Sequence, residues 1–411
     1  MRARANLTRA LRTPIAPFAE RIVRFGRLMR SVALGGAMLS ALGAHAAAPA
    51  ATPAAACGDW PTYRTFVTRF VQQDGRVVDF STAVQQTTSE GQSYAMFFAL
   101  VANDRATFDR LLKWTRENLA GGKFDANNMQ LPAWQWGRKP DGSWGVIDPN
   151  PASDSDLWIA YDLLQAGRLW RAPDYTAMGR ALAAQIVSRE VVDLANFGPM
   201  LLPGPVGFIA GGRTRLNPSY LPLPVLRGLA TDLGDSPWSA LAQNTLKMVV
   251  ATSPHGFTPD WTLWSDGLFG VDRKTGDVGS YDAIRVYLWA GLTASADPLA
   301  KPWLDAVRGM TERVSQTGVP PEKVAVSTGV GTGVGPLSYW GALAPYFAAL
   351  GDTHNLGLAR AQLGALDNAP AGREPVYYDY VLGLFGTGAI DGRYRFDANG
   401  QLIPAWGQAC Q

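Results

Sequence analysis

Residues Thr87–Phe98 read Thr-Thr-Ser-Glu-Gly-Gln-Ser-Tyr-Ala-Met-Phe-Phe, a short polar segment that becomes an apolar helical run. Thr88 or Ser89 can cap the expected helix. Its apolar face recurs at helical spacing, at Tyr94, Phe97, Phe98 and Val101. Glu90 lies at the start of this run, where a carboxyl group can be fixed and partly desolvated, as general-acid chemistry requires. The alternative is that Glu90 only complements the helix dipole.

The same helical periodicity recurs about twelve times along the chain, whereas strand signals are scarce. The expected helices cover residues 61–73, 91–102, 104–119, 154–171, 174–189, 219–233, 237–252, 280–293, 298–317, 334–350, 353–364 and 375–386. Long loops rich in Gly, Pro, Trp and Asp occur at 121–153, 196–218, 254–279 and 318–333. Loops of this length are usually functional. The pattern predicts an all-α fold, an (α/α)6 barrel of paired helices, with the loops forming a substrate groove. A small β-hairpin is expected at residues 393–406.

The first part of the chain has the composition of a secretory signal. Met29 and Arg30 precede an apolar run at 31–43 and then Ala44-His45-Ala46, a small-x-small cleavage site. We expect a signal peptide over 1–46, with Met29 as a second candidate start. A flexible Ala/Pro segment at 47–56 and a single catalytic domain at 57–411 are expected to follow. The mature protein should be periplasmic or secreted and, lacking a long apolar run, should have no membrane span.

The basic charge belongs to the leader. Residues 1–46 carry a net charge of +7, so the mature chain changes from +3 to about −4, which argues against a nucleic-acid partner. Cys57 and Cys410 are the only cysteines. In an exported protein we expect them to form a disulfide between the chain ends. The alternatives are two free thiols or lipidation at Cys57, although the preceding Ala54–Ala56 lacks the large apolar residue that lipidation favours.

Two further helix starts offer carboxylates. Asp154 and Asp156 follow the loop 121–153 and could hold a sugar or a metal, or simply cap their helix. Asp282 and Arg285 stand at i, i+3 and can pair on one face. If the pair is functional, Arg285 keeps Asp282 ionised, as a base that activates water requires. If it is not, the two residues form a structural salt bridge.

Aromatic residues accompany these acids, whereas other catalytic groups are scarce. The aromatic candidates are Trp134, Trp136, Trp144, Trp158, Trp261, Trp264, Tyr94, Tyr281 and Tyr287. Each could pack in the core or grip a pyranose ring. Outside the leader only His255 and His354 occur, which disfavours a zinc site or a Ser-His-Asp triad. The Gly-rich segment 329–335 follows no βαβ pattern and is expected to be a mobile loop. We expect no cofactor and no metal. Carboxylates with aromatics point to glycoside hydrolysis.

The segment Ala152–Trp170, Ala-Ser-Asp-Ser-Asp-Leu-Trp-Ile-Ala-Tyr-Asp-Leu-Leu-Gln-Ala-Gly-Arg-Leu-Trp, resembles the signature of glycoside hydrolase family 8. It departs at Ser155, where the family usually has Ala or Gly, and at Asp162, where it usually has Ser or Ala. Ser89-Glu-Gly-Gln-Ser-Tyr94 resembles the proton-donor motif of the family, and Tyr281-Asp-Ala-Ile-Arg285 resembles its base motif.

From Cys57 to Cys410 the chain more closely resembles the periplasmic endo-1,4-β-glucanases encoded with bacterial cellulose synthase. The likeness includes Leu131-Pro-Ala-Trp-Gln-Trp-Gly, Asn217-Pro-Ser-Tyr-Leu-Pro and Pro320-Pro-Glu-Lys. It implies hydrolysis of internal β-1,4 bonds of cellulose with inversion, in support of cellulose synthesis and export. Glu90 would be the general acid and Asp282 the base, and Asp154 would orient the distorted sugar.

Tyr94, Trp136, Trp158, Tyr220 and Arg285 are the expected substrate-binding residues, either lining a sugar subsite or supporting the residues that do. The expected partners are a β-1,4-glucan chain and, functionally, a cellulose synthase complex, with the protein itself a monomer. Two alternatives remain. One is a non-catalytic glucan-binding scaffold of the export machinery, and the other is a family member acting on xylan, chitosan or mixed-linkage glucan.

Overall fold

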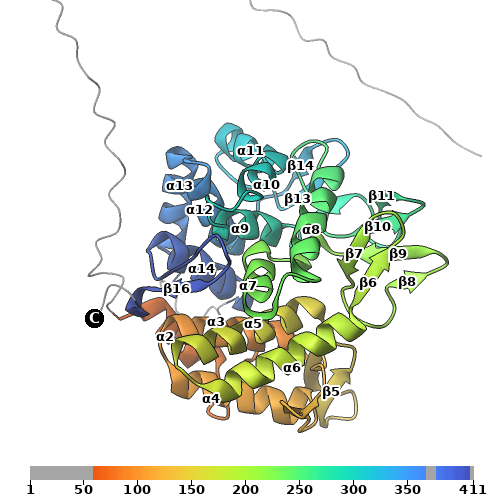
Figure 1. Cartoon of the computed structure of the whole chain (residues 1–411). Coiled ribbons are helices and arrows are strands. Elements are labelled where there is room, and N and C mark those ends of the chain that lie inside the picture. Colours follow the sequence, from red (N-terminus) through yellow and green to blue (C-terminus); the bar gives the residue numbers. More distant parts are fainter. Residues whose placement is uncertain (1–58, 367–375, 408–411) are drawn as a thin grey trace, which may run out of the picture. The chain divides into compact units, whose positions relative to one another are not determined.

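A ring of six helices forms the centre of the fold (Figure 1). The computed structural model describes residues 59–366 and 376–407. The inner helices are α3 (Ser89–Val101), α5 (Ser153–Leu169), α7 (Leu223–Leu233), α9 (Ile284–Leu292), α12 (Leu337–Ala349) and α14 (Tyr377–Ile390). Each packs on the next in this order, and Phe98 of α3 meets Phe385 of α14 with ring centroids 4.8 Å apart, which closes the ring.

A second layer of helices surrounds this ring. It contains α2 (Pro61–Phe70), α4 (Arg105–Trp114), α6 (Pro173–Arg189), α8 (Trp238–Thr252), α10 (Ala300–Ala306), α11 (Gly309–Thr317) and α13 (Thr353–Leu363). α4 packs on α3, α6 on α5, α8 on α7, α10 on α9, α13 on α12, and α2 on α14. α3 buries all its residues except Glu90, as an inner helix must, whereas α4 buries only one face. The predicted (α/α)6 barrel is confirmed.

Four large aromatic side chains fill the axis of the barrel. Phe97 of α3 contacts Trp158 of α5 at 5.0 Å between centroids, and Trp158 contacts Trp289 of α9 at 5.6 Å and Phe385 of α14 at 5.5 Å. Trp158 and Trp289 are each 1% exposed. Burying rings of this size stabilises the fold and leaves the axis solid rather than open.

Three expected helices are divided. The segment 298–317 is two helices, α10 and α11, with a break at Val307 and Arg308. The segment 219–233 begins with a separate 3-10 turn, η2 (Pro218–Tyr220), because a residue before proline, here Leu221 before Pro222, disfavours the helical backbone. The segment 104–119 ends in a π-helical turn, η1 (Thr115–Leu119).

The long loops contain short antiparallel strands, which the sequence did not predict beyond one hairpin. One sheet joins β1 (Thr87–Thr88), β4 (Gln135–Arg138) and β5 (Trp144–Asp148). A second joins β11 (Leu268–Val271), β10 (Thr262–Ser265), β9 (Arg213–Leu216) and β8 (Ile209–Ala210), and a third joins β12 (Val278–Gly279), β13 (Lys323–Ala325) and β14 (Val330–Thr332). Hairpins are formed by β2 (Phe124–Asp125) with β3 (Asn128–Met129), β6 (Val191–Leu194) with β7 (Gly198–Leu201), and β15 (Tyr394–Phe396) with β16 (Leu402–Pro404).

The last of these hairpins, β15–β16, is the one predicted near the chain end, and it ends in a 3-10 turn, η3 (Ala405–Gly407). The Gly-rich segment 329–335, expected to be a loop, supplies strand β14. Most of the strands that were missed are only two to four residues long, and such strands offer little alternation from which to predict them.

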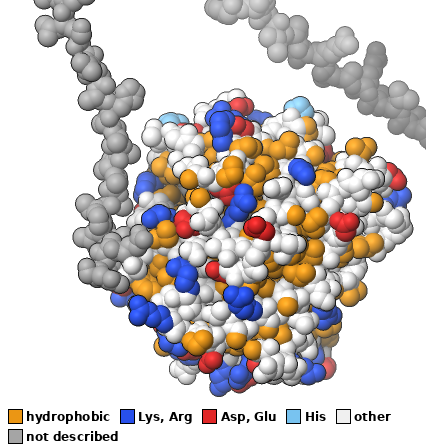
Figure 2. All heavy atoms as spheres, in the orientation of Figure 1, with side chains coloured by type: hydrophobic (Ala, Val, Ile, Leu, Met, Phe, Trp, Pro, Cys, Tyr) orange, Lys and Arg blue, Asp and Glu red, His pale blue; other side chains and the backbone are white. Residues whose placement is uncertain are grey.

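Several predictions fall outside the described residues, namely the signal peptide over 1–46, the Ala/Pro segment at 47–56 and the Cys57–Cys410 disulfide. Within residues 59–366 and 376–407, no helix has the length and apolarity needed to cross a membrane. On the face shown in Figure 2, basic side chains are scattered, with acidic side chains between them.

Candidate active site

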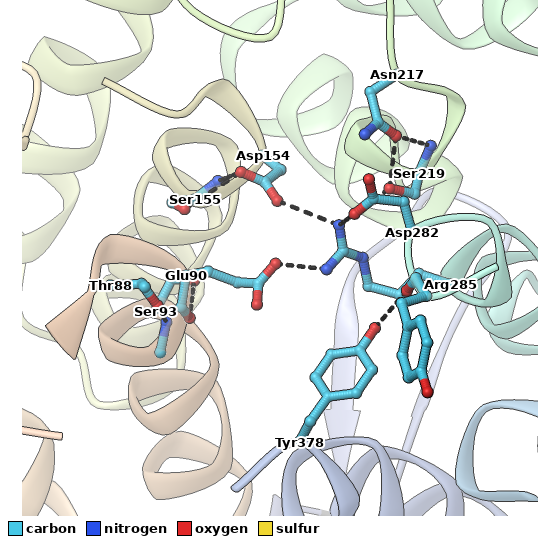
Figure 3. A network of polar contacts seen from close by, with 12 residues as sticks. Thr88, Glu90, Ser93, Asp154, Ser155, Asn217, Ser219, Asp282, Arg285 and Tyr378 are labelled. Atoms are coloured by element: carbon cyan, nitrogen blue, oxygen red, sulfur yellow. Dashed lines mark hydrogen bonds and ion pairs between the residues drawn. The ribbon is translucent and has the colours of Figure 1, made fainter. Parts of the chain in front are cut away.

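Three carboxylates converge at the amino ends of inner helices. Glu90 is in the first turn of α3, Asp154 is in the first turn of α5, and Asp282 is in the turn before α9. In Figure 3, Glu90 and Asp154 approach from one side and Asp282 from the other. The hydroxyl of Thr88 accepts a hydrogen bond from the amide of Gly91 at 3.0 Å, which is one of the two caps predicted for this helix.

The guanidinium of Arg285 lies between the three acids. Its Nη1 donates to Glu90 Oε2 at 2.6 Å, and its Nη2 donates to Asp282 Oδ1 at 3.2 Å. Asp154 Oδ2 is 3.9 Å from Nη2, and Nη2 also donates to Ser219 Oγ at 3.0 Å. The predicted Asp282–Arg285 pair is therefore present. Because the same cation also reaches across the barrel to Glu90, the pair is more than a local salt bridge on α9.

Burial shapes the protonation of this cluster. It raises the pKa of Glu90 to about 7, although Arg285 opposes the shift, and nearby Asp154 adds to it. Burial likewise raises the pKa of Asp154 and of Asp282, again against the opposing charge of Arg285. Glu90 can therefore hold a proton near neutral pH, which a general acid must do.

A cavity of about 510 Å³ opens beside these groups. Glu90, Asp282 and Arg285 line it, together with acidic, amide and tyrosine side chains, among them Asp79, Gln86, Tyr281, Tyr377, Tyr378 and Asp379. Tyr281 is 42% exposed at this rim, and its hydroxyl donates to Glu322 Oε1 at 3.1 Å. Hydroxyl, amide and carboxylate groups around an aromatic surface suit a polyhydroxylated ligand.

The expected substrate-binding residues differ in their access to solvent. Tyr220 is partly exposed, and its ring lies 5.9 Å from the Arg285 guanidinium carbon and 6.0 Å from the Trp261 ring. Trp136 is also partly exposed and stacks on Trp144 at 5.5 Å, with an interplanar angle of 20°. Both rings remain candidates for sugar contact.

Tyr94 and Trp158 do not line a sugar subsite. Each is 1% exposed, and their rings pack edge to face, 5.9 Å apart. Neither presents a free face to a sugar, so only a supporting role behind the site is open to them. Sequence spacing places them on the correct helices but does not show whether those helix faces are open.

Asp156 was predicted together with Asp154 as a possible sugar or metal ligand, but it is not one of the three carboxylates around Arg285. Its side chain is fully buried, and neither of its oxygens has a hydrogen-bond partner that meets normal geometry within the described part of the chain. Burial and the neighbouring Glu190 raise its pKa well above the ordinary value. Since α5 turns by about 100° per residue, two residues on the helix separate the two aspartates onto different faces.

Three contributors were not assigned roles from the sequence. Ser219 binds Arg285 and is itself held by Asn217, whose Oδ1 accepts from the Ser219 amide at 2.9 Å. Asp260 binds the turn that carries Asp282. Tyr378 donates to the carbonyl of Tyr281 at 2.7 Å. The Asn-Pro-Ser-Tyr motif contained the only sequence signal for any of them.

Comparison with known proteins identifies the family of this chain. The model of the glycosyl hydrolases family 8 matches residues 37–392. The chain belongs to this family. It is therefore a glycosidase.

Curated relatives of this family 8 chain are close over most of its length. An endoglucanase of Xanthomonas axonopodis pv. citri is 48% identical over 366 residues, which cover 89% of this chain and 94% of the relative. An endoglucanase of Escherichia coli O157:H7 is 44% identical over 357 residues, which cover 87% and 94%. Among solved structures, the endo-1,4-D-glucanase from Vibrio fischeri ES114 matches with a TM-score of 0.80 at 41% identity, over 85% of this chain and 99% of that one.

Proposed function

We propose that the protein is an endo-1,4-β-glucanase that hydrolyses internal bonds of a cellulose chain with inversion at the anomeric carbon. The observation that carries the proposal is the bridge from Glu90 through Arg285 to Asp282, with hydrogen bonds of 2.6 and 3.2 Å. Two carboxyl groups on opposite ends of one guanidinium are compatible with the spacing of about 6.5–9.5 Å that leaves room for a water in inverting glycosidases.

Glu90 is the general acid in this proposal. Its pKa of about 7 leaves it partly protonated at neutral pH, and its place in the first turn of α3, whose other residues are all buried, fixes its direction. Proton transfer from Glu90 to the glycosidic oxygen lets the leaving sugar depart as an alcohol. The oxocarbenium-like sugar that remains is attacked from the opposite face.

Asp282 is the base that activates the attacking water. The cation of Arg285 opposes the rise in pKa caused by burial and so favours the ionised form of this carboxyl. Asp154, held through its Oδ1 by the amide of Ser155 at 2.8 Å, would orient and stabilise the distorted ring between acid and base.

Replacement of Glu90 tests the assignment of the general acid. Glu90→Gln should lower hydrolysis of carboxymethyl cellulose by about 10²–10⁴-fold. The loss should be smaller on an aryl cellooligosaccharide, whose leaving group needs no proton. Glu117→Gln, at an exposed position on η1, is the matched control. Activity of Glu90→Gln close to wild type would refute Glu90 as the general acid, whereas a wild-type protein that hydrolyses none of these substrates would favour the non-catalytic scaffold.

Product chemistry tests inversion and the substrate. Proton NMR during the first minutes of hydrolysis should show the α-anomer at the new reducing end, whereas a β-anomer would show retention. A panel of cellulose, xylan, chitosan and mixed-linkage glucan tests specificity, and faster cleavage of any substrate other than cellulose would replace the proposed one.

We also propose that the protein is exported, that Cys57 and Cys410 form a disulfide, and that the enzyme acts together with a cellulose synthase complex. The guanidinium of Arg393 donates to the carbonyl of Asp59 at 2.8 Å, and its own carbonyl accepts from the amide of Ala405 at 2.9 Å. Residues close to Cys57 and Cys410 in sequence thus both bind Arg393, one through its side chain and the other through its backbone, which supports the pairing. Intact mass of the exported protein should rise by two hydrogens on reduction, and an unchanged mass would contradict the disulfide.

A further inference from the structure

The carboxylate of Asp260 binds the turn that carries the proposed base. Its Oδ1 accepts hydrogen bonds from the amides of Ser280 at 2.7 Å, Ala283 at 2.8 Å and Asp282 itself at 3.2 Å. Its Oδ2 accepts from the hydroxyl of Ser280 at 2.5 Å. One side chain therefore satisfies three amides at the start of α9, which have no partner within that helix.

Asp260 is itself anchored to the chain beside this turn. Its amide donates to the carbonyl of Val278 at 2.8 Å, and β12, which contains Val278, pairs with β13. On the other side of the turn, the hydroxyl of Tyr378 donates to the carbonyl of Tyr281. The backbone of Asp282 is thus held from two directions.

Charged and titratable groups surround Asp282 from every element packed against it. Arg285 lies on its own helix, and Asp260 lies on the loop before β10. The groups facing it from other elements are Glu90 of α3, Asp154 of α5, Tyr220 of η2 and Tyr378 of α14. Arg285 binds the carboxylate of Asp282, whereas Asp260 places a negative charge behind its amide.

We propose that Asp260 is a positioning residue for the catalytic base, fixing the 280–283 turn through four hydrogen bonds and acting on Asp282 through its charge. The inference rests on the proposed role of Asp282. Asp260 makes no contact with the sugar in this scheme. Its charge makes ionisation of Asp282 less favourable and so raises the pKa of the base, in opposition to Arg285.

The pH dependence of kcat/KM tests this inference. Asp260→Asn keeps the Oδ1 acceptor for the three amides, and the hydroxyl of Ser280 can rotate to accept from the new amide group. With one negative charge fewer beside Asp282, the acidic limb of the profile on carboxymethyl cellulose should move to lower pH by about 0.5–1 unit. Asp260→Ala also loses the hydrogen bonds and should lower kcat about tenfold or more below Asp260→Asn.

The matched control is Asp352→Asn. Asp352 caps the outer helix α13 by accepting from the amide of Asn355 at 3.0 Å, so the same substitution removes an equal charge away from the cavity and keeps the acceptor of the cap. Its acidic limb should coincide with that of the wild type. An acidic limb for Asp260→Asn that also coincides with wild type would overturn the inference.

A second variant covers the case in which Asp260→Asn does not fold. Ser280→Ala removes the 2.5 Å hydroxyl bond and leaves the charge of Asp260 less compensated. The acidic limb should then move to higher pH, and an unmoved limb would count against the inference. Asp282→Asn separates the two proposals. An active Asp282→Asn enzyme refutes the base assignment. If Asp282→Asn is inactive but the acidic limb of Asp260→Asn does not move, only the positioning role of Asp260 is refuted.

Discussion

Replacement of Asp162 by alanine should stabilise the protein, and by more at higher pH. Asp162 lies on the inner helix α5, is fully buried, and has no hydrogen-bond partner for either carboxyl oxygen among residues 59–366 and 376–407. Burial raises its pKa well above the ordinary value. A buried neutral carboxyl without partners costs about 1–3 kcal/mol.

The pH dependence follows from proton linkage. In the unfolded chain this carboxyl titrates near pH 3.9, at about its unperturbed value. Because the folded form keeps its proton to a higher pH than the unfolded form, ionisation of Asp162 does not reduce the free energy of unfolding below pH 3.9. Above that pH the free energy of unfolding falls by about 1.4 kcal/mol per pH unit, until the folded form also ionises. While the folded side chain stays protonated, Asp162→Ala should therefore gain about 1.4 kcal/mol on the wild type for each pH unit above 3.9.

Urea unfolding at pH 5, 6 and 7 measures this difference. The cavity left by the carboxyl should offset the gain by about 1 kcal/mol at every pH, so it does not affect the slope. Glu117→Ala, at an exposed site, controls for the loss of an acid as such. The reasoning fails if the difference in unfolding free energy between wild type and Asp162→Ala is the same at pH 5 and pH 7.

Three further predictions concern the site and the core. The alkaline limb of the pH profile of kcat/KM should lie near pH 7 if Glu90 is the acid. Asp154→Asn should move this limb to lower pH, because the charge of Asp154 raises the pKa of Glu90, and pH profiles of both enzymes check this. Trp158→Ala should lower the free energy of unfolding by about 3–5 kcal/mol, because its ring fills the barrel axis, and Trp158→Phe should lower it less; urea unfolding measures both. Trp136→Ala should raise KM for long glucans while changing kcat little, and an unchanged KM would remove Trp136 from the substrate-binding residues.

The sequence predicted the barrel because helical periodicity recurs about twelve times and long loops separate the expected helix pairs. It also located the three acids, since each stands where a polar segment becomes an apolar helix. It could not show that Arg285 would reach Glu90, because that contact joins residues on opposite sides of the ring. Spacing along one helix predicts neighbours on that helix only.

The remaining differences have similar causes. Trp158 and Trp136 are alike in type, but one fills the axis and the other lies on a short sheet, and composition does not distinguish these environments. Asp260 stands in a loop segment without helical or strand periodicity, so nothing in the sequence connects it to a turn about twenty residues later. Long-range hydrogen bonds of this kind become visible only in three dimensions.

The closure of the ring has a consequence for biosynthesis. α14, which leaves the ribosome near the end of translation, packs on α2 and α3, which leave first: Phe70 contacts Tyr377 and Tyr380, and Phe98 contacts Phe385. A nascent chain that stops before Tyr377 has no partner helix to cover these aromatic faces. Contacts between distant parts of a sequence also form slowly. Completion of the barrel therefore waits for almost the whole chain, and a truncated chain should aggregate rather than retain partial activity.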